Sequence, residues 1–92
     1  MEPPATGIAG GQATVAAAGT RVQLPDQPAR TCSIKALPAN TGVIYVGGSA
    51  VAAANGYPLS AGDAVDIAIE NLSDLWIDAS ANGQSVAWLV VS

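Results

Sequence analysis

The chain has 92 residues, a formal net charge of −4, no His, one Cys and three basic residues. Because the usual bases, nucleophile pairs and metal-ligand clusters cannot be assembled from this set, we predict no catalytic, metal or cofactor site. The acidic balance argues against nucleic-acid binding, which needs a basic surface, and against binding to anionic membranes.

The composition also predicts a thin core and a covered surface. One domain fits the length, and half of the residues are hydrophobic, but nineteen of these are Ala. Charged residues make up 11% of the chain, whereas ordinary soluble domains have about 25%. We therefore expect a homo-oligomer or a larger partner to cover much of the surface. The alternative is a surface of exposed Ala and Gly.

The first twelve residues (MEPPATGIAGGQ) carry Pro, Gly and Ala without any periodicity. Alone, such a composition is typical of a segment without regular structure. We predict that residues 1–12 form an extended N-terminal arm on a neighbouring subunit or partner, followed by a single domain over 13–92. The alternative is a tail held by its own domain. No signal-peptide pattern and no transmembrane run is present, so we expect synthesis in the cytoplasm.

After the arm, short strand-like runs alternate with turn signals. Strands are expected at residues 14–18, 21–24, 32–37, 43–46, 57–59, 64–70, 75–79 and 86–91. Turns are expected at 38–42, 71–74 and the Asn-Gly pair of 81–84, while the Ala-rich residues 49–54 stay ambiguous. No amphipathic helical period is present. The pattern predicts an all-β fold: a small β-sandwich or jelly-roll-like domain of seven or eight short antiparallel strands.

Several side chains stand out as candidates for contact with a partner. Residues 86–91 are apolar on both faces, which is typical of a central strand or an interface. Alternation puts Trp76 on the outer face of its strand, where it serves as a partner contact, as a stacking platform for sugar, or lies under the chain's own loops. Trp88 and Cys32 are predicted to be core residues. The interface candidates are Met1, Pro3, Pro4, Ile8, Trp76, Leu89 and Val91.

The acidic residues offer a second, less favoured candidate for a functional site. If the strands at 64–70 and 75–79 pair through the turn between them, Asp66, Glu70 and Asp78 gather on one outward face. Such a group would suit glycoside hydrolysis or calcium binding. Solvated strand faces are the favoured interpretation, because no calcium-loop spacing is present.

Four motifs carry a resemblance to a known family. They are GTRVQL (19–24), NTGxIYVG (40–47), NGYPLxxGD (55–63) and NLSDLWIDA (71–79). In these motifs and their order, covering about three quarters of the chain, the sequence resembles small structural proteins of tailed bacteriophages, of the capsid decoration (cement) type. The resemblance implies a homotrimer on the outer surface of the major capsid protein shell, on the virion exterior, with no catalytic residues. The alternative is a tail, baseplate or fibre domain that binds host-surface carbohydrate through Trp76 with Asp78 or Asn82.

Overall fold

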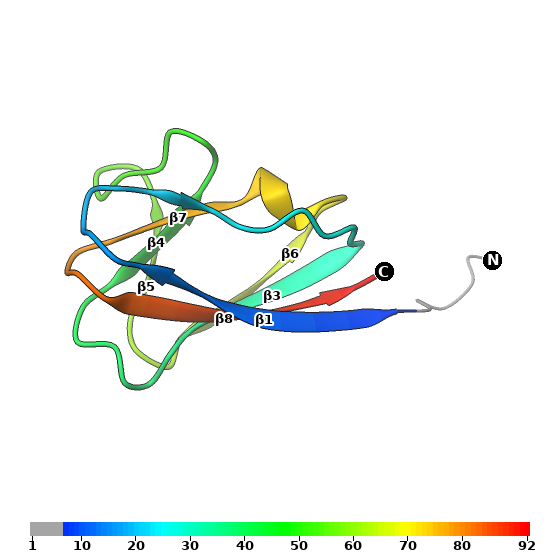
Figure 1. The fold of residues 1–92 in the computed structure, drawn as a ribbon, viewed down its shortest axis with the longest axis horizontal. Helices are drawn as coiled ribbons and strands as arrows, with labels where there is room; N and C mark the ends of the chain where they lie inside the picture. Colours follow the sequence, from blue (N-terminus) through cyan, green and yellow to red (C-terminus); the bar gives the residue numbers. More distant parts are fainter. Residues whose placement is uncertain (1–6) are drawn as a thin grey trace.

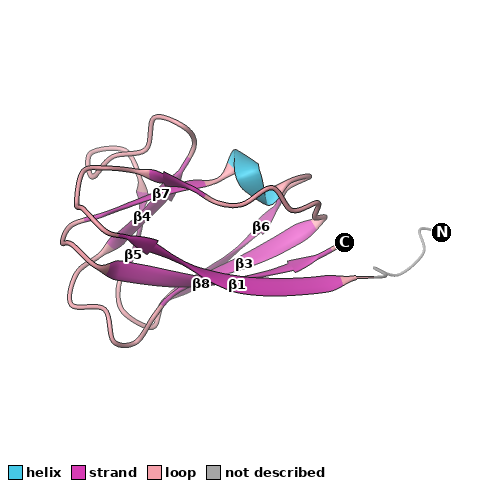
Figure 2. Cartoon of the chain, viewed as in Figure 1, coloured by secondary structure: helices cyan, strands magenta, loops and turns pink. Residues whose placement is uncertain are grey.

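The computed structural model describes residues 7–92, which form eight β-strands and one short 3₁₀-helix (Figures 1 and 2). The elements in chain order are β1 (Ile8–Val15), β2 (Val22–Gln23), β3 (Thr31–Ala36), β4 (Ile44–Gly47), β5 (Tyr57–Leu59), β6 (Ala64–Ala68), η1 (Leu72–Asp74), β7 (Trp76–Ala79) and β8 (Gln84–Val91).

The strands form two four-stranded antiparallel sheets packed face to face. Sheet A has the order β1-β8-β3-β6, and sheet B has the order β2-β7-β4-β5. The first strand pairs with the last, β2 with β7, β3 with β6 and β4 with β5. The chain is thus one long hairpin, with its tip between β4 and β5, wrapped into two layers. This is the topology of a jelly roll, so the predicted fold class is confirmed.

The first strand begins earlier than the sequence predicts. Ile8–Val15 pairs with β8 along its whole length, from Ile8 opposite Val91 to Val15 opposite Gln84. The predicted arm over residues 1–12 is therefore wrong for residues 8–12, which belong to the chain's own sheet; Met1, Pro3 and Pro4 lie outside the described residues. The alternation was hidden because Ala and Gly occupy most of this strand and give little contrast in hydropathy.

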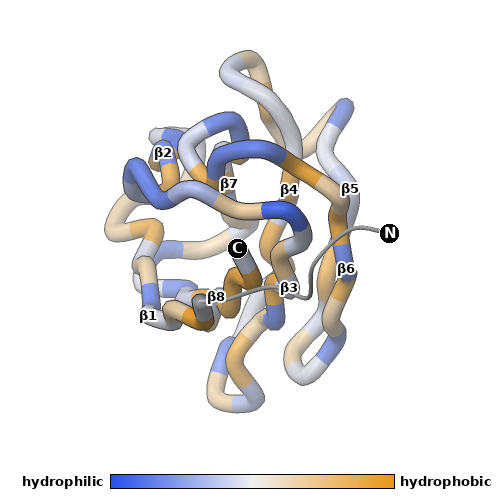
Figure 3. The backbone as a smooth tube through the Cα atoms, turned by 90° about the vertical axis from the view of Figure 1, so that its right-hand side faces the viewer, coloured by the Kyte–Doolittle hydropathy of each residue, from blue (hydrophilic) through white to orange (hydrophobic). Residues whose placement is uncertain are grey.

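The core consists of branched aliphatic side chains from both sheets. Its largest fully buried members are Leu, Ile and Val residues together with Cys32: Leu24, Ile34, Ile44, Leu72, Ile77, Val15, Val86 and Val90. Trp88 packs against this cluster and is partly buried, and Cys32 is a core residue as predicted. Figure 3 views the sandwich from its end, with apolar segments along the strands of both layers.

A buried amide fixes two loops at one end of the sandwich. Gln84 Oε1 accepts hydrogen bonds from the backbone N–H groups of Thr41 and Gly42, both at 2.8 Å, and Nε2 donates to Thr41 Oγ1 and to the Asn82 carbonyl. Gln84 is only 3% exposed, so these bonds satisfy an amide that would otherwise be costly to bury. They attach the β3–β4 loop to the β7–β8 turn.

The ambiguous segment at 49–54 forms turns rather than a helix. Val51, in this segment, is buried and lies over Gly47 on the side of sheet B that faces away from sheet A; a Cβ atom at Gly47 would come within 2.9 Å of Val51 Cγ2. The loop that connects β4 and β5 therefore covers part of the outer face of sheet B.

Candidate functional site

The outer face of sheet A is the surface on which the predicted interface residues meet. Strand register places side chains in rows across four strands, because residues directly opposite in an antiparallel pair point to the same side. The first row holds Ile8, Val91, Thr31 and Ala68, and the second holds Gly10, Leu89, Ser33 and Asp66. The third row holds Gln12, Ala87, Lys35 and Ala64. We call these twelve residues the outer face of sheet A.

The β1–β8 half of this face is apolar apart from Gln12, and its two most exposed large side chains are Ile8 and Leu89. Ile8 is 75% exposed and Leu89 is 47% exposed, although both belong to paired strands of a sheet. The Leu89 side chain lies beside Gly10, where an added Cβ atom would be 3.4 Å from Leu89 Cδ1. Because Gly10 and Ala87 are small, they do not cover Leu89, and an exposed apolar group of this kind suits contact with another macromolecule.

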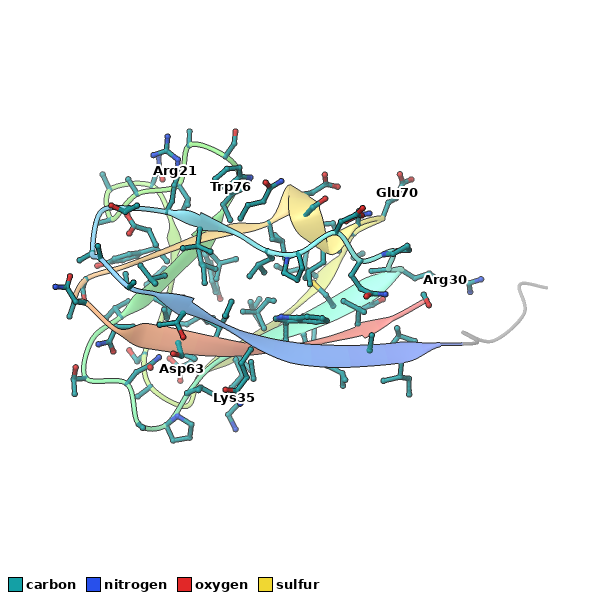
Figure 4. The ribbon with its side chains drawn as sticks, viewed as in Figure 1. Arg21, Arg30, Lys35, Asp63, Glu70 and Trp76 are labelled. Atoms are coloured by element: carbon teal, nitrogen blue, oxygen red, sulfur yellow. The ribbon has the colours of Figure 1, made fainter. Side chains whose placement is uncertain are left out.

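Charge lies on the opposite half of the same face. Lys35 and Asp66 come from β3 and β6, and Ser33 Oγ donates a hydrogen bond of 2.6 Å to Asp66 Oδ1. Figure 4 shows Lys35 pointing away from the sandwich on the sheet A side. The outer face of sheet A thus combines an apolar half with a half that carries one charge of each sign.

Trp76 is on the other side of the molecule. It lies on the outward side of β7 in sheet B, as alternation predicts, between Gly47 of β4 and Gln23 of β2. It is partly buried, and Figure 4 shows it near Arg21 at the top of the view. Trp76 therefore cannot act on one surface with Ile8, Leu89 and Val91.

The polar residues predicted to accompany Trp76 at a sugar site are already engaged. Asp78 is 4% exposed, and its Oδ1 accepts hydrogen bonds from the backbone N–H groups of Gly19, at 2.9 Å, and Ala79, at 2.8 Å. Asn82 Oδ1 accepts a hydrogen bond of 2.8 Å from the backbone N–H of Ala18. Both side chains hold the loop between β1 and β2 against the sandwich, so this loop also covers sheet B.

Asp66 and Asp78 do not gather on one face, which the sequence allowed only if their two strands paired. Asp66 lies on β6 in sheet A, whereas Asp78 lies on β7 in sheet B, because the chain crosses between sheets at η1 instead of forming a hairpin. Within residues 7–92, no group of three or more His, Cys, Asp or Glu side chains is placed to hold a metal ion.

Cys32 lies beneath the outer face of sheet A and is 1% exposed. Burial raises the pKa of its thiol, and the nearby negative charge of Asp66 raises it further. The thiol is therefore protonated at neutral pH and acts as a small apolar core group.

The sequence analysis identified three residues of the outer face of sheet A as interface candidates and missed the other nine. Ile8, Leu89 and Val91 come together as neighbours through the pairing of β1 with β8. Gly10 and Ala87, the small neighbours of Leu89 on this face, were missed, because small residues in a strand give no signal until the register is known. Val86–Val91, predicted as central or interfacial, is indeed in the central strand β8.

Comparison with protein-family models, with curated proteins and with solved structures finds no match for this chain. Among residues 7–92, no helix has the length and hydropathy required to cross a membrane.

Proposed function

We propose that this protein is a capsid decoration (cement) protein of a tailed bacteriophage, which binds the major capsid protein on the exterior of the shell through the outer face of sheet A. The observation that carries the proposal is the exposure of Ile8 and Leu89 on the β1–β8 half of that face. The resemblance of residues 19–79 to capsid decoration proteins implies three further parts of this proposal. They are the major capsid protein as the partner, the virion exterior as the location, and a homotrimer as the form in which the protein sits on the shell.

The fold supports this proposal by analogy only. Two-sheet jelly rolls recur in viral capsid proteins, but also in lectins and in unrelated enzymes of the cupin class. Because one fold serves several unrelated functions, the function of this protein has to be inferred from the residues on its surface. Within residues 7–92, loops cover part of the outer face of sheet B, whereas Ile8 and Leu89 on the outer face of sheet A are exposed.

Binding would stabilise the shell by mass action. A protein that binds the assembled shell and not its dissociated subunits shifts the equilibrium toward assembly. Repeated over a lattice, modest apolar contacts are sufficient, since every copy adds its own contribution. Because Lys35 and Asp66 carry opposite charges, we expect affinity to depend only weakly on salt concentration.

The test is co-sedimentation of the purified protein with empty, expanded heads that lack it, together with the temperature at which those heads rupture. Saturable binding with a raised rupture temperature supports the proposal and gives the number of copies. Leu89→Lys should weaken binding by about thirtyfold, because it places a charge at the centre of the apolar half. Tyr57→Lys is the matched control, since Tyr57 is 60% exposed on β5 of sheet B and should leave binding unchanged.

Two results would count against the proposal. Equal binding by the two variants would exclude the outer face of sheet A as the contact surface. No binding by the unaltered protein would exclude the cement role and would direct the search to a tail or host-recognition module, tested with glycans.

A further inference from the structure

Each sheet of the sandwich has two edge strands, and three of the four edges are short or interrupted. β2 has two residues, β5 has three and includes Pro58, and β6 has five and includes Asp66. Short edges, Pro and charge are the usual means by which proteins prevent edge-to-edge pairing. The fourth edge strand, β1, has eight residues (IAGGQATV) with no charge and no Pro.

The backbone groups on the free side of β1 can be identified from its pairing. Gly7 N–H donates to the Ser92 carbonyl at 3.2 Å, and Ser92 N–H donates to the Gly7 carbonyl at 2.9 Å. Hydrogen-bonded and non-hydrogen-bonded pairs alternate along an antiparallel ladder, so the odd-numbered residues of β1 bond to β8. The even-numbered residues direct their N–H and C=O groups to the outside: Ile8, Gly10, Gln12 and Thr14. In the described part of the chain, no strand pairs with that side of β1.

We propose that the free edge of β1 pairs with β1 of a second copy of this chain, antiparallel, about a two-fold axis at Gly11. In this register Ile8 lies opposite Thr14 of the second copy and Gly10 lies opposite Gln12, so all four outward-facing residues of each strand form hydrogen-bonded pairs. The two A sheets then form one continuous eight-stranded sheet. The interface is isologous, with the same strand on both sides.

Three features of β1 favour a second copy as the occupant. Self-pairing brings a strand against itself, so any charge would face its own copy, and β1 carries none. Gly11 has no side chain at the axis, where the two strands approach most closely. Pairing also extends the apolar half of the outer face across the junction, because Ile8 and Leu89 of both copies lie on the same side of the joined sheet.

This inference does not rest on the proposed function. It also differs from the homotrimer implied by the resemblance, because a two-fold axis produces a dimer.

The first experiment is sedimentation equilibrium of the full chain over a range of protein concentrations. We expect a particle of twice the 9.1 kDa chain mass. Gln12→Pro removes an outward-facing N–H group and should leave the ladder to β8 intact, since Pro is tolerated where an edge N–H faces outward. This variant should be monomeric. Ala68→Pro makes the same change on β6, where Ile69 N–H bonds to Arg30 and Ala68 therefore faces the free edge; it should remain dimeric.

Amide hydrogen exchange on the unaltered protein tests the pairing without any variant. We expect the N–H groups of Gly10, Gln12 and Thr14 to exchange about tenfold more slowly at concentrations where the dimer forms, and those of Gly11 and Ala13 to be protected throughout. A monomer at every concentration, a trimer in place of the dimer, or a dimer that persists in Gln12→Pro would overturn the proposal. Rapid exchange of the even-numbered amides at every protein concentration would overturn it as well. Should Gln12→Pro fail to fold, the exchange pattern decides.

Discussion

Substitution of Gly11 by Ala should destabilise the protein because Trp88 occupies the space beside it. Gly11 lies directly opposite Trp88 on the inward side of sheet A. A Cβ atom at Gly11 would be 2.7 Å from Trp88 Cζ2 and 3.0 Å from Cε2, whereas ordinary contacts begin at 3.4 Å. The indole would have to move by about 0.7 Å against a close-packed core, and overpacking of this kind costs about 1–3 kcal/mol.

The measurement is thermal and urea unfolding at one fixed protein concentration, followed by tryptophan fluorescence. For a domain of this size, each kcal/mol lowers the Tm by about 4–8 °C, so we expect a decrease of about 5–20 °C in Gly11→Ala. Gly10→Ala is the matched control: its Cβ atom would point outward, with its nearest contacts at 3.3 and 3.4 Å, and it should change stability by less than about 1 kcal/mol. Equal effects at the two positions would refute the packing of Trp88 over Gly11.

Further predictions concern the buried polar groups and the thiol. Gln84→Ala leaves the N–H groups of Thr41 and Gly42 without their acceptor and should lower the free energy of unfolding by about 2–4 kcal/mol in urea titrations; an unchanged midpoint would contradict the network. Asp78→Ala should cost a similar amount and expose the β1–β2 loop to proteolysis, because Asp78 holds Gly19; resistance equal to the unaltered protein would count against this. Because the pKa of the Cys32 thiol is raised in the folded protein, the unfolded chain loses this proton first, and stability should fall as pH rises above the ordinary thiol pKa of about 8.5. Cys32→Val should lack that part of the decrease, and identical pH profiles would disprove it.

The all-β class and most strand positions followed from the sequence because strand periodicity is a local property. Cys32, Ile34 and Ala36 alternate with polar residues in β3, Val65 and Ile67 flank Asp66 in β6, and Pro and Gly separate the runs. Two features of the fold could not be predicted from the sequence. The start of β1 was missed because Gly10 and Gly11 show no preference for a face, and the pairing of β6 with β3 instead of β7 depends on crossings between sheets that no local pattern encodes.

The candidate site was only partly predictable for a related reason. Alternation within one strand correctly placed Trp76 on the outward side of its strand. Whether an outward side is open depends on loops from elsewhere in the chain. Val51 and Gly19 lie over part of the outer side of sheet B, whereas within residues 7–92 Ile8 and Leu89 on the outer face of sheet A stay exposed. Among the described residues, the small aliphatic face around Leu89 is therefore a better candidate than the aromatic side chain.

The two proposed contacts are adjacent but separable, which makes their roles independently measurable. The outer face of sheet A acts through side chains, so Leu89→Lys should weaken shell binding by about thirtyfold and leave the β1 edge, and hence the dimer, intact. The edge acts through backbone groups, so Gln12→Pro should dissociate the dimer without placing charge on the apolar half. If dimerisation doubles the number of contacts per particle, Gln12→Pro will also weaken shell binding through loss of bivalency. Weakened shell binding by a Leu89→Lys protein that is still a dimer identifies the outer face of sheet A as the shell contact. Loss of the dimer together with weakened shell binding in Gln12→Pro identifies the edge of β1 as the dimer contact. A Leu89→Lys protein that becomes monomeric would show that a single surface serves both contacts and that the two-fold axis is wrongly placed.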